Sequence, residues 1–123
     1  MDNKNIKRQN EALKEIAEMQ KDILDFNAEI DRHIFEINQT LWSNDQHKMQ
    51  RCIERTTHKH PDWWQYINNR SALLGVIFSS PATTLSLQKQ ALQNKKSVHG
   101  FMETLKRGAK LQVKWQLEDM QEK

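Results

Sequence analysis

The chain has 123 residues, of which 28% are charged and 37% hydrophobic, and its formal net charge is +3. This length allows one domain with one small core, and the polar composition argues against the deep apolar interior of a large enzyme. Only three glycines and two prolines occur, so the turns that hairpins and Gly-rich phosphate loops require are nearly absent and helices are expected.

The compartment is predicted from the N-terminus and the cysteine count. The first ten residues are polar, and no later window approaches the roughly 18 uninterrupted apolar residues that a membrane span needs. The lone Cys52 cannot form an internal disulfide, which suits a reducing compartment. We therefore expect a cytoplasmic protein with neither a cleaved signal nor a membrane span.

The first half of the chain predicts one long helix over residues 5–42, because its apolar residues recur every three or four positions. Polar Gln20 and Asn27 fill two gaps in this seam, and we expect them to be buried there. The isoleucine-rich pattern favours an antiparallel bundle or a higher oligomer over a parallel two-stranded coiled coil. The seam consists of Leu13, Ile16, Ile23, Ile30, Ile34, Ile37 and Leu41.

Two shorter helices are predicted next, over residues 45–57 and 61–78. The run 43–45 (Ser-Asn-Asp) ends the first helix and supplies side chains that cap a helix N-terminus. The run 60–62 (His-Pro-Asp) breaks the chain again, since proline is tolerated only in the first turn of a helix. Adjacent Trp63 and Trp64 must point about 100° apart, so we expect one to be buried and the other to lie at the rim.

A second long helix is predicted over residues 81–120, with Ser80 as its cap and Pro81 in its first turn. The fold class is thus all-α: an elongated antiparallel helical bundle of two long and two shorter helices, forming one domain over 1–123. The apolar positions of the last helix are Leu85, Leu92, Val98, Met102, Leu105, Ala109, Val113, Leu117 and Met120.

Candidate catalytic and metal sites are weak. His58 and His60, with His47 one helix away, lack the three or four ligands at regular spacing that zinc sites use. Cys52 has no histidine one helical turn away to activate it, and no dinucleotide, phosphate-loop or zinc-protease motif occurs. We expect no enzymatic activity, no metal and no cofactor.

Charge is unevenly distributed, with a net −3 over residues 1–43, +2 over 44–80 and +4 over 81–123. One interpretation is that an acidic first helix attracts a basic last helix across the bundle. The other is a basic face that binds nucleic-acid phosphates, beside Trp115 as a stacking residue. The candidate anion-binding residues are Lys96, Lys106, Arg107, Lys110 and Lys114.

Two stretches resemble parts of known families. Residues 62–74, which include Trp63, Trp64 and Leu74, followed by a last helix with Leu92 to Leu105, resemble the layout of flagellar and type III export chaperones. In those small helical proteins an amphipathic helix grips an export substrate. Residues 30–35 are similar to a short helical string of the primosomal replication protein C family. Neither stretch contains a diagnostic motif.

The leading hypothesis is a small protein-binding adaptor, chaperone-like or a sequestering regulator, that engages a partner protein through helix faces. The alternative is a nucleic-acid-associated accessory protein that binds phosphates through the last helix, and a structural homo-oligomer is also open. Each aromatic anchor has a competing role in the chain's own core. The candidate partner-binding residues are Leu24, Phe26, Phe35, Trp63 and Trp64.

Overall fold

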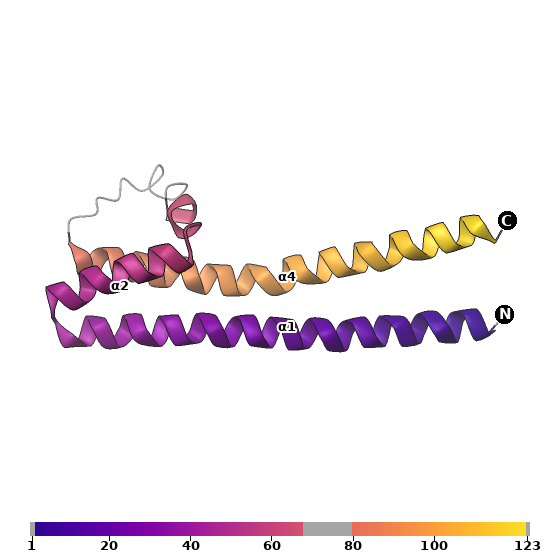
Figure 1. Ribbon diagram of the computed structural model, residues 1–123, viewed down its shortest axis with the longest axis horizontal. Coiled ribbons are helices and arrows are strands. Elements are labelled where there is room, and N and C mark those ends of the chain that lie inside the picture. The colour runs from indigo at the N-terminus through magenta and orange to yellow at the C-terminus, as the bar shows by residue number, and fades with distance from the viewer. Residues whose placement is uncertain (1, 68–79, 123) are drawn as a thin grey trace. The chain divides into compact units, whose positions relative to one another are not determined.

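The computed structural model describes residues 2–67 and 80–122, and within these ranges every regular element is a helix. Helix α1 spans Asp2–Ser43, α2 spans Gln46–Lys59 and α4 spans Pro81–Gln121 (Figure 1). The predicted all-α bundle with two long helices is confirmed.

The helix boundaries follow the capping residues. Asn44 adopts a positive φ of 54° and ends α1, and its amide donates to the Leu41 carbonyl at 3.3 Å. Asp45 then caps α2, since its Oδ1 accepts from the amides of His47 and Lys48 at 3.0 and 3.2 Å. Ser80 Oγ accepts from the Thr83 amide at 3.2 Å and caps α4. Short polar side chains satisfy the otherwise unpaired first-turn amides in this way.

The third predicted helix is seen only in part. Residues 61 and 62 form a turn and residues 63–67 are helical, so the helix starts two residues later than the prediction of 61–78. The remainder of that prediction lies outside the described residues. As expected for neighbouring positions on a helix, Trp63 is buried and Trp64 is half-buried.

The chain divides into two compact units. Unit 1 combines Met1–Asn27 with Ser97–Lys123, and unit 2 is Ala28–Lys96. Each long helix contributes one segment to each unit, and the units are described separately below.

Unit 2 contains an apolar core built from α1, α2, α4 and residues 63–67. Ile37, Leu85 and Leu92 are fully buried, and Met49 and Cys52 of α2 are 2% and 1% exposed. Trp63, Ile67 and Ala91 form a second buried cluster, with Trp64 packed against it. Every hydrophobic side chain found buried in the described residues belongs to this unit.

A buried polar network ties α2 to α4 inside this core. Gln88 is fully buried, and its Nε2 donates to the Ile53 carbonyl at 3.2 Å and to Thr57 Oγ1 at 3.0 Å. Thr57 Oγ1 also accepts from Trp63 Nε1 at 3.1 Å. Because burying an amide without partners is costly, these bonds fix the position of α4 against α2.

Replacing Leu92 with alanine is predicted to reduce the free energy of unfolding by about 2–5 kcal/mol, because it leaves a cavity in the unit 2 core. The matched control is Leu24→Ala in α1, whose side chain is 67% exposed; it should change stability by less than about 0.5 kcal/mol. Urea unfolding followed by circular dichroism checks both values. Equal losses in the two variants would contradict the observed burial.

Candidate protein-interaction surface

The two helices of unit 1 meet through charged side chains. None of residues 3–27 and 97–122 is buried, and the contacts across the pair join acids and bases. Lys114 Nζ contacts Glu11 Oε2 at 2.7 Å, which also accepts from Trp115 Nε1 at 3.4 Å. Ion pairs of this kind replace the apolar packing that usually joins two helices.

Arg107 is the centre of this charged interface. Its guanidinium binds Glu15 of α1 at 3.1 Å, Glu103 of α4 at 2.8 Å and Asp22 of α1. It is only 18% exposed, and hydrogen bonding to Glu103, followed by that to Asp22, raises its pKa. The same contact lowers the pKa of Glu103. A single side chain thus links α4 to two acids of α1, two helical turns apart.

A second ionic cluster joins the chain ends of unit 1. Asp119 Oδ1 accepts from Arg8 at 2.6 Å and from Lys4 at 2.5 Å, and Lys4 also contacts Glu122 at 2.8 Å. These two cations lower the pKa of Asp119 to about 2. Arg8 further donates to the Trp115 carbonyl and lies 5.5 Å from the ring centroid. Early α1 residues therefore contact late α4 residues, which makes the pair antiparallel.

Nearer its other end, the pair has one ring stack and one close approach at a glycine. Phe26 stacks on His99 with ring centroids 3.8 Å apart. A Cβ on Gly100 would lie at ordinary contact distance, 3.9 Å, from Ile23. A cavity of about 270 Å³ lies further along the interface, lined by Ile16, Met19, Leu111 and Trp115 among others. The interior of unit 1 is thus incompletely filled.

Opposite this interface, α4 carries a row of exposed apolar side chains that we call the outer stripe. Leu105 and Arg107 point about 160° apart on a helix, so the stripe faces away from α1. Its members are Val98 (45% exposed), Phe101 (65%), Met102 (55%), Leu105 (54%), Val113 (55%), Leu117 (55%) and Met120 (70%).

The two apolar seams predicted from the sequence are largely exposed in unit 1, and the expected burial of Gln20 is wrong. Leu13 and Ile16 of the α1 seam are 64% and 44% exposed, and Gln20 is exposed instead of buried. Only the unit 2 part of the seam, around Ile30 and Ile37, is buried. On α4 the charged contacts turn the apolar positions away from α1, whereas on α1 the seam residues Ile16 and Ile23 still face α4.

The five predicted partner-binding residues have different environments. Leu24 and Phe35 are 67% and 62% exposed, and Phe26 is half-buried in its stack with His99. Trp63 is 2% exposed within the unit 2 core, and Trp64 packs beside it with ring centroids 4.1 Å apart. All residues of the outer stripe except Phe101 are predicted from the sequence as apolar positions of the last helix, but none of them is predicted as a partner-binding residue.

Three of the five predicted anion-binding residues contact acids of α1. Lys96 contacts Asp31 at 2.8 Å within unit 2, and Arg107 and Lys114 make the unit 1 contacts described above. Lys106 and Lys110 are exposed and make no ion pair with any described residue. These contacts match the predicted attraction between acidic and basic helices. Nucleic-acid binding stays a prediction, with fewer uncommitted cations than the sequence suggested.

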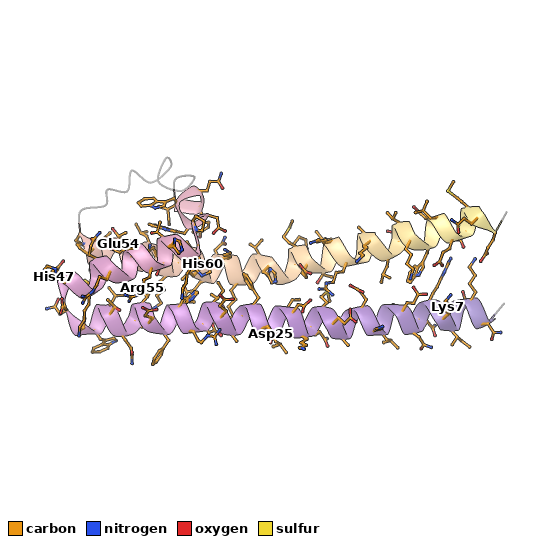
Figure 2. The ribbon with its side chains drawn as sticks, viewed as in Figure 1. Lys7, Asp25, His47, Glu54, Arg55 and His60 are labelled. Atoms are coloured by element: carbon orange, nitrogen blue, oxygen red, sulfur yellow. The ribbon has the colours of Figure 1, made fainter. Side chains whose placement is uncertain are left out.

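A pair of histidines lies in unit 2. His60, at the C-terminal end of α2 (Figure 2), is 6% exposed, and its Nε2 lies 2.6 Å from Nδ1 of His33. Lys95 Nζ lies 3.3 Å from His60 Nδ1 and 3.0 Å from Asp62. An ammonium only donates, so His60 accepts at Nδ1 and donates from Nε2 to His33. Both rings are then neutral.

Burial is the main cause that lowers the pKa of both His60 and His33, and the charges of Lys95 and Lys59 respectively act in the same direction. Glu29 opposes the shift at both rings, with Glu36 at His33 and Asp62 at His60. The described residues contain no group of three or more side chains placed to hold a metal ion. Cys52 is buried.

Comparisons with known proteins give no relative for this chain: no family model, no curated protein and no solved structure matches it. None of the described helices has an apolar stretch that would cross a bilayer.

Replacing Arg107 with glutamine is predicted to loosen the α1–α4 pair of unit 1, because it removes contacts to Glu15, Asp22 and Glu103. Amide hydrogen exchange should become faster in residues 3–27 and 97–122 and stay unchanged in unit 2. The matched control is Lys106→Gln, one residue away and exposed without an ion pair. Similar exchange in both variants would show that the charged contacts do not hold the pair.

Acidification is predicted to destabilise unit 2 first. The histidine pKa values are lowered from 6.5 in the folded chain, so the unfolded chain binds protons more readily and stability falls as pH drops below 6.5. His33→Gln keeps an acceptor for His60 and should weaken this dependence, whereas His47→Gln, exposed on α2, should not. Urea unfolding at pH 7.5 and 5.5 measures it. Identical pH dependence in wild type and His33→Gln would refute the role of this pair.

Proposed function

We propose that this chain is a protein-binding helical module, a chaperone-like adaptor or sequestering regulator, which holds its partner on the outer stripe of α4. The observation that carries the proposal is the exposure of seven large apolar side chains along one helix, Val98 to Met120. Soluble chains rarely leave such a row uncovered unless it binds something.

The size of the stripe supports a specific interface. At about 180 Å² for a large apolar residue and exposures of 45–70%, it offers roughly 700 Å² of surface. It also spans 22 residue steps, or about 33 Å of helix. An amphipathic partner helix with apolar residues every three or four positions would match both the length and the shape of this surface.

The electrostatics of unit 1 support the same conclusion. If α1 covered the stripe, Arg107 would leave Glu15 and Asp22, and Lys114 would leave Glu11. Several ion pairs formed at partly shielded sites would be lost together. We infer that α1 holds α4 by its charged face, so that the apolar face stays available to a partner.

A photo-crosslinking amino acid at Phe101 tests this function. Placed in the full chain inside the cells that produce it, it is expected to form covalent adducts with protein, because Phe101 lies on the stripe and is 65% exposed. The same group at Thr104 points about 60° further from Leu105 than Phe101 does and lies on the cavity side, so it should give few adducts.

Mass spectrometry of the adducts then separates the outcomes. Protein adducts that need Phe101 and disappear with Leu105→Glu support the proposal. Equal labelling at positions 101 and 104, or no protein adducts at either, would refute it. Adducts with nucleic acid that vanish in Lys106→Gln/Lys110→Gln would instead favour the phosphate-binding alternative.

A further inference from the structure

The midline of the stripe runs straight along α4 and is evenly spaced about Ala109, a geometry that a second copy of the chain can match. The residues along its midline are separated by 4, 3, 4, 4, 3 and 4 positions, a series that reads the same from either end with Ala109 at its centre. Three such turns advance 11 residues, which keeps the line straight along an α-helix. The midline residues are Val98, Met102, Leu105, Ala109, Val113, Gln116 and Met120.

We propose that the outer stripe binds a second copy of this chain, with the two α4 helices antiparallel and a two-fold axis at Ala109. This inference rests on the proposed function, since it names the partner at the same site. A two-fold interface must be complementary to itself, so each residue meets its mirror position. Leu105 then meets Val113 of the second copy, and Val98 meets Met120.

Each feature along this line suits the pairing. Ala109 is small and exposed, so two helices can approach closely at the axis. Gln116 meets Met102 and is the polar position that fixes the register of such a seam. Opposed helix dipoles favour the antiparallel direction.

The exposed apolar area of the stripe is close to the area that a stable dimer buries. The roughly 700 Å² estimated for each copy lies close to the ~800 Å² per partner that specific protein interfaces bury. The stripe lies wholly within the unit 1 part of α4, residues 97–121, so the interface needs no rearrangement of unit 2.

The charged residues beside the stripe predict how dimerisation depends on salt concentration. Antiparallel helices bring the same flank of each copy together, so Lys106 of one copy lies near Lys110 of the other. Both lysines are exposed and make no ion pair with a described residue, so they repel across the interface. Salt screens this repulsion, and dimerisation should therefore strengthen as ionic strength rises.

Sedimentation equilibrium of the full chain, from low to several hundred micromolar and at low and high salt, tests the inference. Wild type is expected to reach twice the monomer mass of 14.6 kDa, at lower concentration in high salt. Leu105→Glu should stay monomeric, because dimerisation would bury an unpaired charge. Its dimer dissociation constant should be at least about 100-fold higher than that of wild type. Lys110→Glu should dimerise more tightly in low salt, because it turns repulsion with Lys106 into attraction.

Disulfide trapping tests the direction of the helices without adding charge. In a Cys52→Ala background, Leu105→Cys mixed with Val113→Cys should form mixed disulfides, and Leu105→Cys alone should form few. Cross-linking of Leu105→Cys to itself would indicate a parallel pair and overturn the register. Circular dichroism of each variant confirms that the helices persist.

The two proposals fail in different ways. A wild-type chain that stays monomeric at every concentration and salt overturns the dimer. If Phe101 then cross-links a different protein, the interaction surface stands and its occupant is that protein. If the chain dimerises but Leu105→Glu and Lys110→Glu leave the dimer unchanged, another surface mediates self-association and the dimer proposed for this stripe is refuted.

Discussion

The orientation of α4 in unit 1 depends on the charged contacts that Arg107, Lys114 and Glu118 make with α1. Because these residues share one face of the helix, their pairing directs that face inward and the apolar residues outward. A helix pair normally buries its apolar faces against one another. Here the ionic contacts and the apolar stripe lie on opposite sides of α4, so the helix pair can form and still leave an apolar surface exposed for binding. The proposed function and the proposed dimer both depend on this orientation of α4, with its charged face toward α1 and its apolar face exposed.

The two units therefore rely on different forces. Unit 2 has the buried isoleucines, leucines and tryptophan, together with the Gln88 and Thr57 network, and behaves as an ordinary small core. Unit 1 has ion pairs that are partly exposed, and exposed pairs stabilise only weakly and are screened by salt. The units also respond to different pH ranges. The protonation of His33 and His60 weakens unit 2 below pH 6.5. The Asp119 carboxylate, with its pKa of about 2, stays ionised and keeps its partners in unit 1 to far lower pH.

Sequence patterns predicted the helices well and their environments less well. Caps at Asp45 and Ser80 are local, so α2 and α4 begin within one residue of expectation. The spacing of Leu13, Ile16 and Leu105 correctly indicated an apolar face, but periodicity identifies a face and not what covers it. The acidic residues Glu11, Glu15 and Asp22 recur on one side of α1, and comparing them with Arg107 and Lys114 is the signal that would have revealed the inward face. The histidine pair joins residues that are 27 positions apart in the sequence, so helical spacing could not predict it.

The most direct measurement is the rate of thiol alkylation along α4 at concentrations where the chain is monomeric. Single cysteines are placed at successive positions from 98 to 120 in a Cys52→Ala background. The rates should rise and fall with the helical period, with maxima at the outer stripe, such as Leu105 and Val113, and minima near Arg107, Leu111 and Glu118. Maxima at Arg107 and Leu111 with protection at Leu105 would place the apolar stripe inside the helix pair and contradict the central claim.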